Sequence, residues 1–159
     1  MEFIMDDNID INSIIKSIPL FFDLQPTQLD SITQLSDLIE IDPGDKPIEE
    51  GGSMDFLYIL LEGEVKVTVL IPTIGTVETC TLGPLDILGW SAMTPIVRQR
   101  TGTVTAVTHC WLLRIDSRLL CHLCEYDHDI GFVIYRRIAN VVARSFLTTR
   151  LELMNTLSK

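Results

Sequence analysis

The sequence is poor in basic residues and contains no long apolar run. Its 12 lysines and arginines stand against 22 aspartates and glutamates, which gives a formal net charge of −10. General binding to nucleic acid needs a basic face, so no direct contact with nucleic acid is expected. No apolar run comes near the roughly 18 residues that a membrane-spanning helix needs, so no membrane partner is expected.

The sequence also lacks the marks of secretion, of a disulfide framework and of a zinc site. The opening "MEFIMDDNID" is acidic, without the basic segment of a signal peptide, so a cytoplasmic location is expected. The four cysteines do not predict disulfides in such a compartment. Cys121 and Cys124 have the spacing of a zinc knuckle, but a zinc site needs four ligands and no second pair accompanies them, so no metal is expected. Cys110 is expected to be a buried apolar residue.

Catalytic signatures are missing as well. The three histidines, His109, His122 and His128, include no His-x-His pair of the kind that cupin metalloenzymes use. We find neither a nucleophile-base signature nor a Walker-type loop. The chain is therefore not expected to be an enzyme, and no resident cofactor is expected.

What remains is an apolar chain with an uneven distribution of charge. Hydrophobic residues make up 47% of 159 residues, enough for one folded domain with a core. Up to Glu64 there are 15 acidic residues against Lys16 and Lys46, whereas from Thr94 onward nine basic residues face five acidic ones. This asymmetry leaves room for a local cationic pocket in the second half.

Residues 1–40 are expected to form a helical lead-in. Leu29, Ile32, Leu35 and Ile39 recur at spacings of three and four, which predicts an amphipathic helix. The turn-rich segment "DPGDKPIEEGGSMD" then ends the helical pattern.

Residues 41–116 have the texture of a β-roll. Short runs rich in β-branched residues are separated by turns, and Val65, Val67 and Val69 alternate with polar residues as in a half-buried strand. The fold class is therefore predicted as mainly β with flanking helices, a β-roll or jelly roll. The predicted strands are Phe56 to Leu61, Glu64 to Leu70, Thr76 to Leu82, Gly102 to Thr108 and Cys110 to Ile115.

Residues 117–159 are predicted to be helical. A short helix capped by Asp116 precedes a long one that starts near Asp127 or Asp129. A small β-roll is too short to cover the apolar stripe of this long helix, so packing against a second copy as a homodimer is expected. The stripe consists of Ile134, Ile138, Val141, Val142, Phe146, Leu153 and Leu157.

The segment 83–104 has features suited to an anion. A turn at Gly83 to Asp86 precedes Gly89, which lets a backbone approach a ligand closely. A short helix starting near Ser91 and Ala92 would present unpaired N–H groups. Arg100 could add a two-pronged contact to phosphate oxygens, although a solvated charge at a strand end is the alternative.

These segments together resemble the cyclic nucleotide-binding domain family, found in catabolite-activator-type regulators, kinase regulatory subunits and nucleotide-gated channels. Pro43 to Val67, "PGDKPIEEGGSMDFLYILLEGEVKV", is similar to its glycine-punctuated opening, with a hairpin at Gly63, and 83–104 occupies the place of its phosphate-binding cassette. The activator-type members continue into a helix-turn-helix domain. None follows "LELMNTLSK", so a divergent stand-alone member is expected.

The resemblance also implies a set of ligand-binding residues. Arg100, with Thr101 and Gly102, matches the arginine that grips the cyclic phosphate. Ser145 could reach over the pocket from the long helix, as small polar residues do in the activator-type members, or it could equally face solvent or the dimer seam. The family's glutamate, which accepts a hydrogen bond from the ribose 2′-hydroxyl, is Trp90 here, and an indole has no acceptor. Trp90 could equally be a core aromatic that closes the roll. The predicted ligand-binding residues are Gly89, Trp90, Ser91, Ala92, Arg100, Thr101 and Ser145.

Two functions follow as expectations. In the first, the domain senses a cyclic nucleotide or other anionic small molecule and transmits its binding through the C-terminal helix. In the second, it is a degenerate, ligand-free dimeric interaction module whose pocket is filled by Trp90. Haem sensing, which occurs in the same superfamily, would use Cys80 or a histidine and is a lesser alternative.

Overall fold

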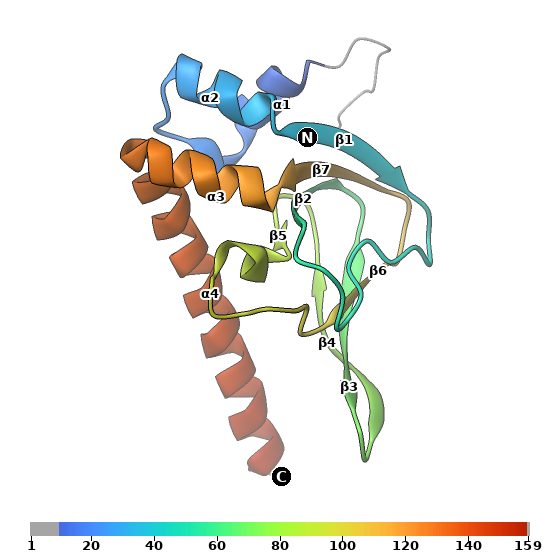
Figure 1. Ribbon diagram of the computed structural model, residues 1–159. Coiled ribbons are helices and arrows are strands. Elements are labelled where there is room, and N and C mark those ends of the chain that lie inside the picture. The colour runs from blue at the N-terminus through green and yellow to red at the C-terminus, as the bar shows by residue number, and fades with distance from the viewer. Residues whose placement is uncertain (1–9, 159) are drawn as a thin grey trace.

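The computed structural model describes residues 10–158 as helices at both ends of a β-roll (Figure 1). The helices are α1 (Ile11–Ser17), α2 (Pro26–Thr33), α3 (Ser117–Tyr126) and α4 (His128–Leu157), with 3-10 helices η1 (Pro19–Phe21) and η2 (Trp90–Met93). The strands are β1 (Ser36–Ile41), β2 (Phe56–Glu62), β3 (Val65–Ile71), β4 (Gly75–Leu82), β5 (Ile87–Leu88), β6 (Thr103–Ala106) and β7 (Cys110–Asp116).

The strands form two antiparallel sheets, one in the order β1-β7-β2-β5 and the other in the order β4-β3-β6. Side chains from both sheets meet in a core that includes Leu60, Val65, Val104 and Leu112. On β3 and β6 the neighbours of Val65 and Val104 point outward, whereas the neighbours of Leu60 and Leu112, among them Ile59 and Leu113, are buried on the other face of their sheet. The prediction of a mainly β fold, a β-roll with flanking helices, is confirmed.

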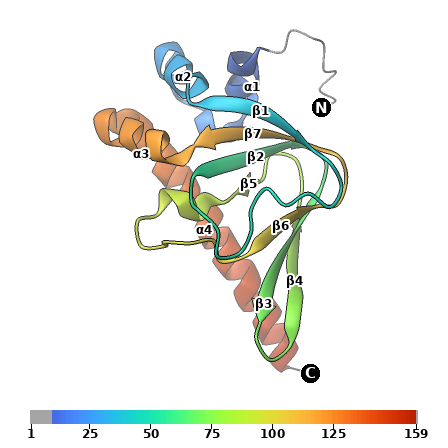
Figure 2. The same cartoon turned by 45° about the vertical axis from the view of Figure 1, so that its right-hand side comes forward.

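A second core joins the helices to the four-stranded sheet. It includes Ile15, Phe21, Ile32, Leu113 and the inward side of α4 at its N-terminal end, all of them buried. Figure 2 shows α1 and α2 at one end of the roll, with α3 and α4 beside it. Cys110, as expected, is fully buried, here in the core between the sheets.

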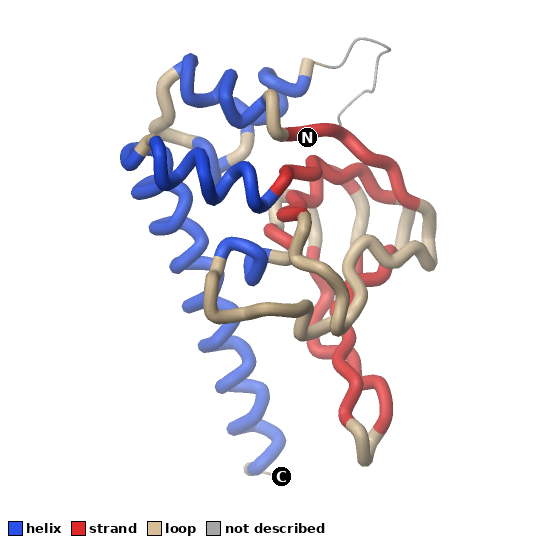
Figure 3. The backbone as a smooth tube through the Cα atoms, in the orientation of Figure 1, coloured by secondary structure: helices blue, strands red, loops and turns tan. Residues whose placement is uncertain are grey.

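The expected helix through Ile39 is wrong in its second half. The helix α2 ends at Thr33, and Ser36–Ile41 is the strand β1, paired with β7 from Ser36 opposite Ile115 to Ile41 opposite Cys110. Tertiary pairing decides here, because β7 offers an open edge and the Arg114 guanidinium donates to Asp37 across the two strands. Figure 3 shows the change from helix to strand along this segment.

The turn at Gly63 is also not the hairpin that the sequence predicts. It leads from β2 in one sheet to β3 in the other. Gly63 has φ of +96°, and a Cβ there would lie 2.4 Å from the carbonyl oxygen of His109, so only glycine fits. The turn therefore fixes how the roll closes.

The predicted start of the long helix is confirmed. The carboxylate of Asp127 accepts hydrogen bonds from the backbone N–H groups of Asp129 (3.0 Å) and Ile130 (3.2 Å). The first part of α4 is buried at Ile130, Ile134 and Ile138, whereas the part beyond Val142 is exposed on all sides. Within residues 10–158, no helix has both the length and the apolar character needed to cross a bilayer. The first nine residues of the predicted lead-in lie outside the described residues.

Candidate functional site

The cassette segment begins with a turn that is closed by Asp86. The backbone N–H of Gly83 donates to Oδ2 of Asp86 at 2.9 Å, and the N–H of Asp86 donates back to the carbonyl of Gly83 at 3.1 Å. Leu85 has φ of 72° inside this turn, and its N–H donates to the carbonyl of Leu60 at 2.7 Å. The Asp86 carboxylate thus closes the turn, and the backbone of Leu85 and Asp86 holds the turn against β2.

Gly89 lies where the cassette backbone touches Arg100. It has φ of +70°, and a Cβ at this position would lie 2.5 Å from Nη1 of Arg100 and 2.9 Å from Cδ1 of Ile48. Both the backbone conformation and the lack of space therefore require glycine. The 3-10 helix η2 follows directly, with the N–H of Ala92 donating to the carbonyl of Gly89 at 3.0 Å.

Arg100 is the central side chain of the site, and it is only 4% exposed. Its Nε donates to the carbonyl of Ser53 at 3.0 Å, its Nη1 to the carbonyl of Gly89 at 2.8 Å, and its Nη2 to the carbonyl of Phe56. The backbone of Arg100 also pairs with the Gly51–Gly52 turn. The arginine therefore ties the cassette to the start of β2.

No carboxylate of the described chain pairs with this buried cation within 4.0 Å. Burial lowers the pKa of Arg100, while the nearby Tyr58 and Asp55 raise it. An arginine nonetheless stays charged in proteins. A guanidinium has five N–H groups, so the three hydrogen bonds leave one N–H on each terminal nitrogen without a partner among residues 10–158.

Trp90 is half-buried and packs against the core beneath the helices, a cluster that also contains Met93 and Ile138. It follows Gly89 directly and forms the first residue of η2. Its indole brings no hydrogen-bond acceptor to the site. Cassette and α4 thus share one continuous apolar core.

The other predicted site residues are less closely gathered. Ser91 is buried, and its hydroxyl points to Sδ of Met54 at 3.9 Å, whereas Thr101 is exposed beside Arg100. Ala92 is half-buried in η2. Ser145 is exposed on α4, and no hydrogen bond joins its side chain to the cassette in the described part of the chain.

The carbonyl oxygens of Ser53 and Phe56 hold Arg100 in place, and this role was not predicted from the sequence. They are backbone groups, so their side chains give no sign of this role. The Gly51–Gly52 pair was the available signal, since it turns the chain beside Arg100. Gly102 lies over β3, since a Cβ there would lie 3.1 Å from the carbonyl oxygen of Thr68 and 3.5 Å from the side chain of Val67.

Among residues 10–158, no three His, Cys, Asp or Glu side chains are gathered as metal ligands would be. Burial raises the pKa of Cys124 to about 12, which disfavours the thiolate that binds metals and attacks electrophiles.

Comparison with known proteins points to one family. The model of the cyclic nucleotide-binding domain matches residues 38–127. A cyclic nucleotide-binding domain from Methylobacillus flagellatus KT is 20% identical, with a TM-score of 0.78 over 92% of this chain and 82% of that one. The sensor domain of the transcriptional regulator DNR from Pseudomonas aeruginosa is 18% identical, with a TM-score of 0.71 over 87% and 95%.

A regulatory relative shares the same fold. The regulatory domain of Toxoplasma gondii PKA, solved with cAMP, is 25% identical, with a TM-score of 0.62 over 70% of this chain and 42% of that one. A search of curated proteins gave no match.

Proposed function

The chain belongs to the cyclic nucleotide-binding domain family, and from that premise we propose that it binds a nucleotide or other anionic small molecule at the cassette. The occurrence of this domain in regulators and sensors supports a regulatory role. We propose that the domain acts as a binding module rather than as an enzyme.

The observation that carries the proposal is the unpaired charge of Arg100. The residue is only 4% exposed, and no carboxylate of the described residues pairs with it within 4.0 Å. A buried charge without a counter-charge is costly. An anionic ligand would supply that charge and accept the two remaining N–H groups in a charge-assisted pair.

Trp90 narrows the class of ligand. A carboxylate that accepts a hydrogen bond from a ribose hydroxyl contributes about 1.5–3 kcal/mol, and the indole cannot replace it. We therefore propose a phosphate-bearing ligand that does not depend on that contact. Ordinary cyclic AMP or cyclic GMP would bind roughly ten- to a hundred-and-fifty-fold more weakly than to a cassette with the glutamate.

A ligand-free dimeric interaction module is the second candidate. Two observations favour it: each guanidinium nitrogen of Arg100 already donates to a backbone carbonyl, and Trp90 packs into the core. In this case Arg100 would act only to hold the cassette to β2.

Transmission through α4 is part of the first proposal. Trp90 and Met93 of η2 pack in the same cluster as Ile134 and Ile138 of α4. A shift of the cassette on binding would therefore displace the packed part of α4, and the exposed part would move with it.

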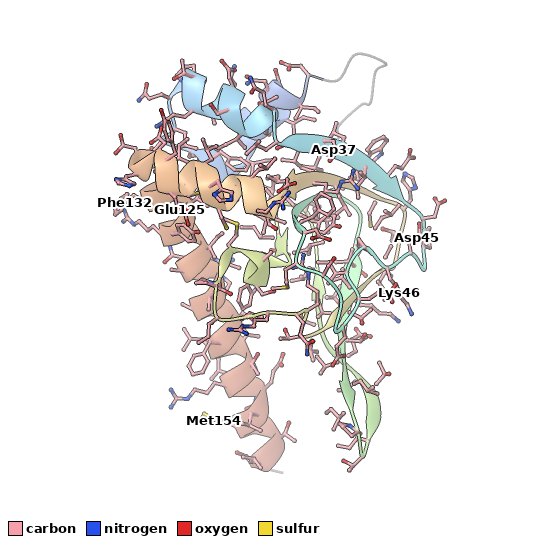
Figure 4. The ribbon with its side chains drawn as sticks, in the orientation of Figure 1. Asp37, Asp45, Lys46, Glu125, Phe132 and Met154 are labelled. Atoms are coloured by element: carbon pink, nitrogen blue, oxygen red, sulfur yellow. The ribbon has the colours of Figure 1, made fainter. Side chains whose placement is uncertain are left out.

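We also propose a homodimer through the exposed half of α4. Met154, labelled in Figure 4, points away from the β-roll. The exposed half of α4 carries many large apolar side chains, and such an exposed apolar surface marks an interface. A Leu151→Glu variant should shift the protein from dimer to monomer in sedimentation equilibrium, with Arg150→Gln as the control. The exposed residues are Phe146, Leu147, Leu151, Leu153, Met154 and Leu157.

Thermal shift with a panel of ligands tests the cassette. Cyclic mononucleotides, cyclic dinucleotides and phosphorylated metabolites are added to the wild type, to Arg100→Ala and to Thr101→Ala. Arg98→Ala, an exposed arginine two residues earlier, is the matched control. We expect at least one ligand to raise the melting temperature of the wild type and the control, but not of Arg100→Ala. If Arg100→Ala does not fold, Thr101→Ala decides.

Tryptophan fluorescence separates the two candidates. In a Trp111→Phe background the emission comes from Trp90 alone. A ligand at the cassette should change that emission in a saturable way. If no member of the panel changes either melting or emission, the sensor proposal fails and the ligand-free module stands.

A further inference from the structure

The outer face of the three-stranded sheet carries a groove that is separate from the cassette. The groove has a volume of about 520 Å³, and threonines of β3, β4 and β6 form its floor. This volume lies within the range of roughly 300–1,000 Å³ that small-molecule sites occupy. Its polar wall is formed by Lys46, Glu50 and Lys66.

Strand register places the groove on the side away from the core. Val65, Val67 and Val104 point into the roll, so the alternating residues Lys66 and Thr68 point outward. On β6, Thr105 lies opposite Lys66 and Thr103 lies opposite Thr68. Facing pairs in a sheet have Cβ atoms about 4.5–5.5 Å apart, so ammonium and hydroxyl groups gather on one surface.

The loop that carries Lys46 is fixed along the edge of β6. Gly44 N–H donates to the carbonyl of Ala106 at 2.9 Å, Ala106 N–H to that of Asp45 at 2.9 Å, and Val104 N–H to that of Ile48 at 2.8 Å. Figure 4 shows Asp45 and Lys46 on this loop, on the side of the molecule opposite α4. The groove wall is therefore preformed.

Glu50 completes the wall, and its carboxylate is committed to the backbone. Oε2 of Glu50 accepts the N–H of Leu70 at 2.9 Å, and the backbone N–H of Glu50 donates to Oγ1 of Thr103 at 3.0 Å. The strand β6 begins at Thr103, opposite Thr68. Leu70 lies beyond that pair on β3, and its backbone N–H donates to the Glu50 carboxylate instead of to a carbonyl of β6.

The two ammonium groups have no such commitment. Of the four lysines in the sequence, two line this groove, in a chain with a net charge of −10. Within residues 10–158 neither Lys46 nor Lys66 forms an ion pair within 4.0 Å. With Glu50 counted, the groove carries a net charge of +1 (two lysines minus one glutamate).

We propose that this groove is a second anion site, which binds a small molecule bearing a phosphate group. Lys46 and Lys66 would hold the phosphate as point charges, and the hydroxyls of Thr103 and Thr105 would donate to its oxygens or to hydroxyls of the ligand. The site needs neither Arg100 nor the ligand proposed for the cassette, so the two proposals stand or fall separately.

The test is a titration of the full chain with pyrophosphate, followed by ¹H–¹⁵N correlation spectra. We expect saturable shifts at the amides of Lys66, Thr68, Thr103 and Thr105. The Lys46→Gln/Lys66→Gln double variant should weaken binding at least tenfold. Lys16→Gln, which removes one positive charge from α1, should leave the affinity unchanged.

Four results would overturn the proposal. Shifts confined to Gly89, Arg100 and Thr101 would place the anion at the cassette. Equal shifts with sodium chloride at matched ionic strength would show only general screening. An affinity that stays the same in the double variant would show that the lysines do not hold the anion. Titration with citrate separates phosphate from carboxylate ligands, and tighter binding of citrate would also contradict the proposal.

Discussion

The cassette and the outer groove use positive charge in opposite ways. At the cassette one arginine is buried and donates to three backbone carbonyls, whereas at the groove two lysines lie at the surface without an ion-pair partner in residues 10–158. Arginine suits the first task because its planar fork satisfies several acceptors at once. Lysine suits the second because its mobile ammonium keeps its charge available for a ligand.

Stability and ligand binding are therefore expected to respond differently to substitutions in the two regions. Removal of a buried, hydrogen-bonded cation leaves polar groups without partners, while removal of an exposed one leaves nothing unsatisfied. Substitution of Arg100 should therefore change folding and binding together. Substitution of the groove lysines, Lys46 and Lys66, should change binding alone.

The largest effect is expected for Arg100→Ala. Three carbonyls lose a charged donor, so the free energy of unfolding should fall by about 3–5 kcal/mol, since hydrogen bonds to charged groups contribute about 1.5–3 kcal/mol each and partial hydration offsets some of the loss. Urea denaturation measures the change, and Arg98→Ala should stay within about 0.5 kcal/mol of the wild type. A loss below about 1 kcal/mol for Arg100→Ala would remove the structural role that we assign to it.

Gly89→Ala should have the second largest effect. A left-handed conformation costs an alanine about 1–2 kcal/mol, and crowding adds to this, so we expect a loss of about 1–3 kcal/mol. The new Cβ would press on Nη1 of Arg100 at 2.5 Å and on Ile48 at 2.9 Å. Urea denaturation again measures the loss. The Gly89→Ala/Arg100→Ala double variant should lose less stability than the sum of the two single losses, because Arg100→Ala already removes the contact between the two residues.

Glu50→Ala tests the wall of the groove and should have a smaller effect. The exposed carboxylate accepts one N–H, from Leu70, so the loss should be about 0.5–1 kcal/mol. Hydrogen exchange at the Leu70 amide should become faster, while exchange at Leu60, in the core of the roll, should not change. Unchanged exchange at Leu70 would mean that this hydrogen bond does not protect the amide.

Much of the fold could be predicted because its apolar residues recur with clear periods. Alternation identified β3, and the caps of α3 and α4 were visible as aspartates before apolar helices. The strand β1 was missed because Leu35 and Ile39 also fit a helical spacing, and only the neighbouring strand β7 decides between the two. The strand β5 has two residues, too few for any period to appear.

For the site, spacing along the chain identified Gly89 and Arg100, which the structure brings together. It could not identify the acceptors of Arg100, because these are backbone carbonyls at Ser53 and Phe56. It also could not place Lys46 over the outer face of β6, because that depends on a loop held by backbone hydrogen bonds. Sequence patterns report side chains, and both proposed anion sites depend on backbone contacts between distant segments.

The smallest effect on folding is expected at the groove lysines. Lys46→Gln and Lys66→Gln should each change the free energy of unfolding by less than about 0.5 kcal/mol, because neither ammonium group has an ion-pair partner in the described chain to lose. Urea denaturation in low salt measures this, with Lys16→Gln as the reference for one lost positive charge. A destabilisation above about 1 kcal/mol would show that a lysine holds the sheet together, as Arg100 holds the cassette. The contrast between a buried structural cation and a free binding cation would then disappear.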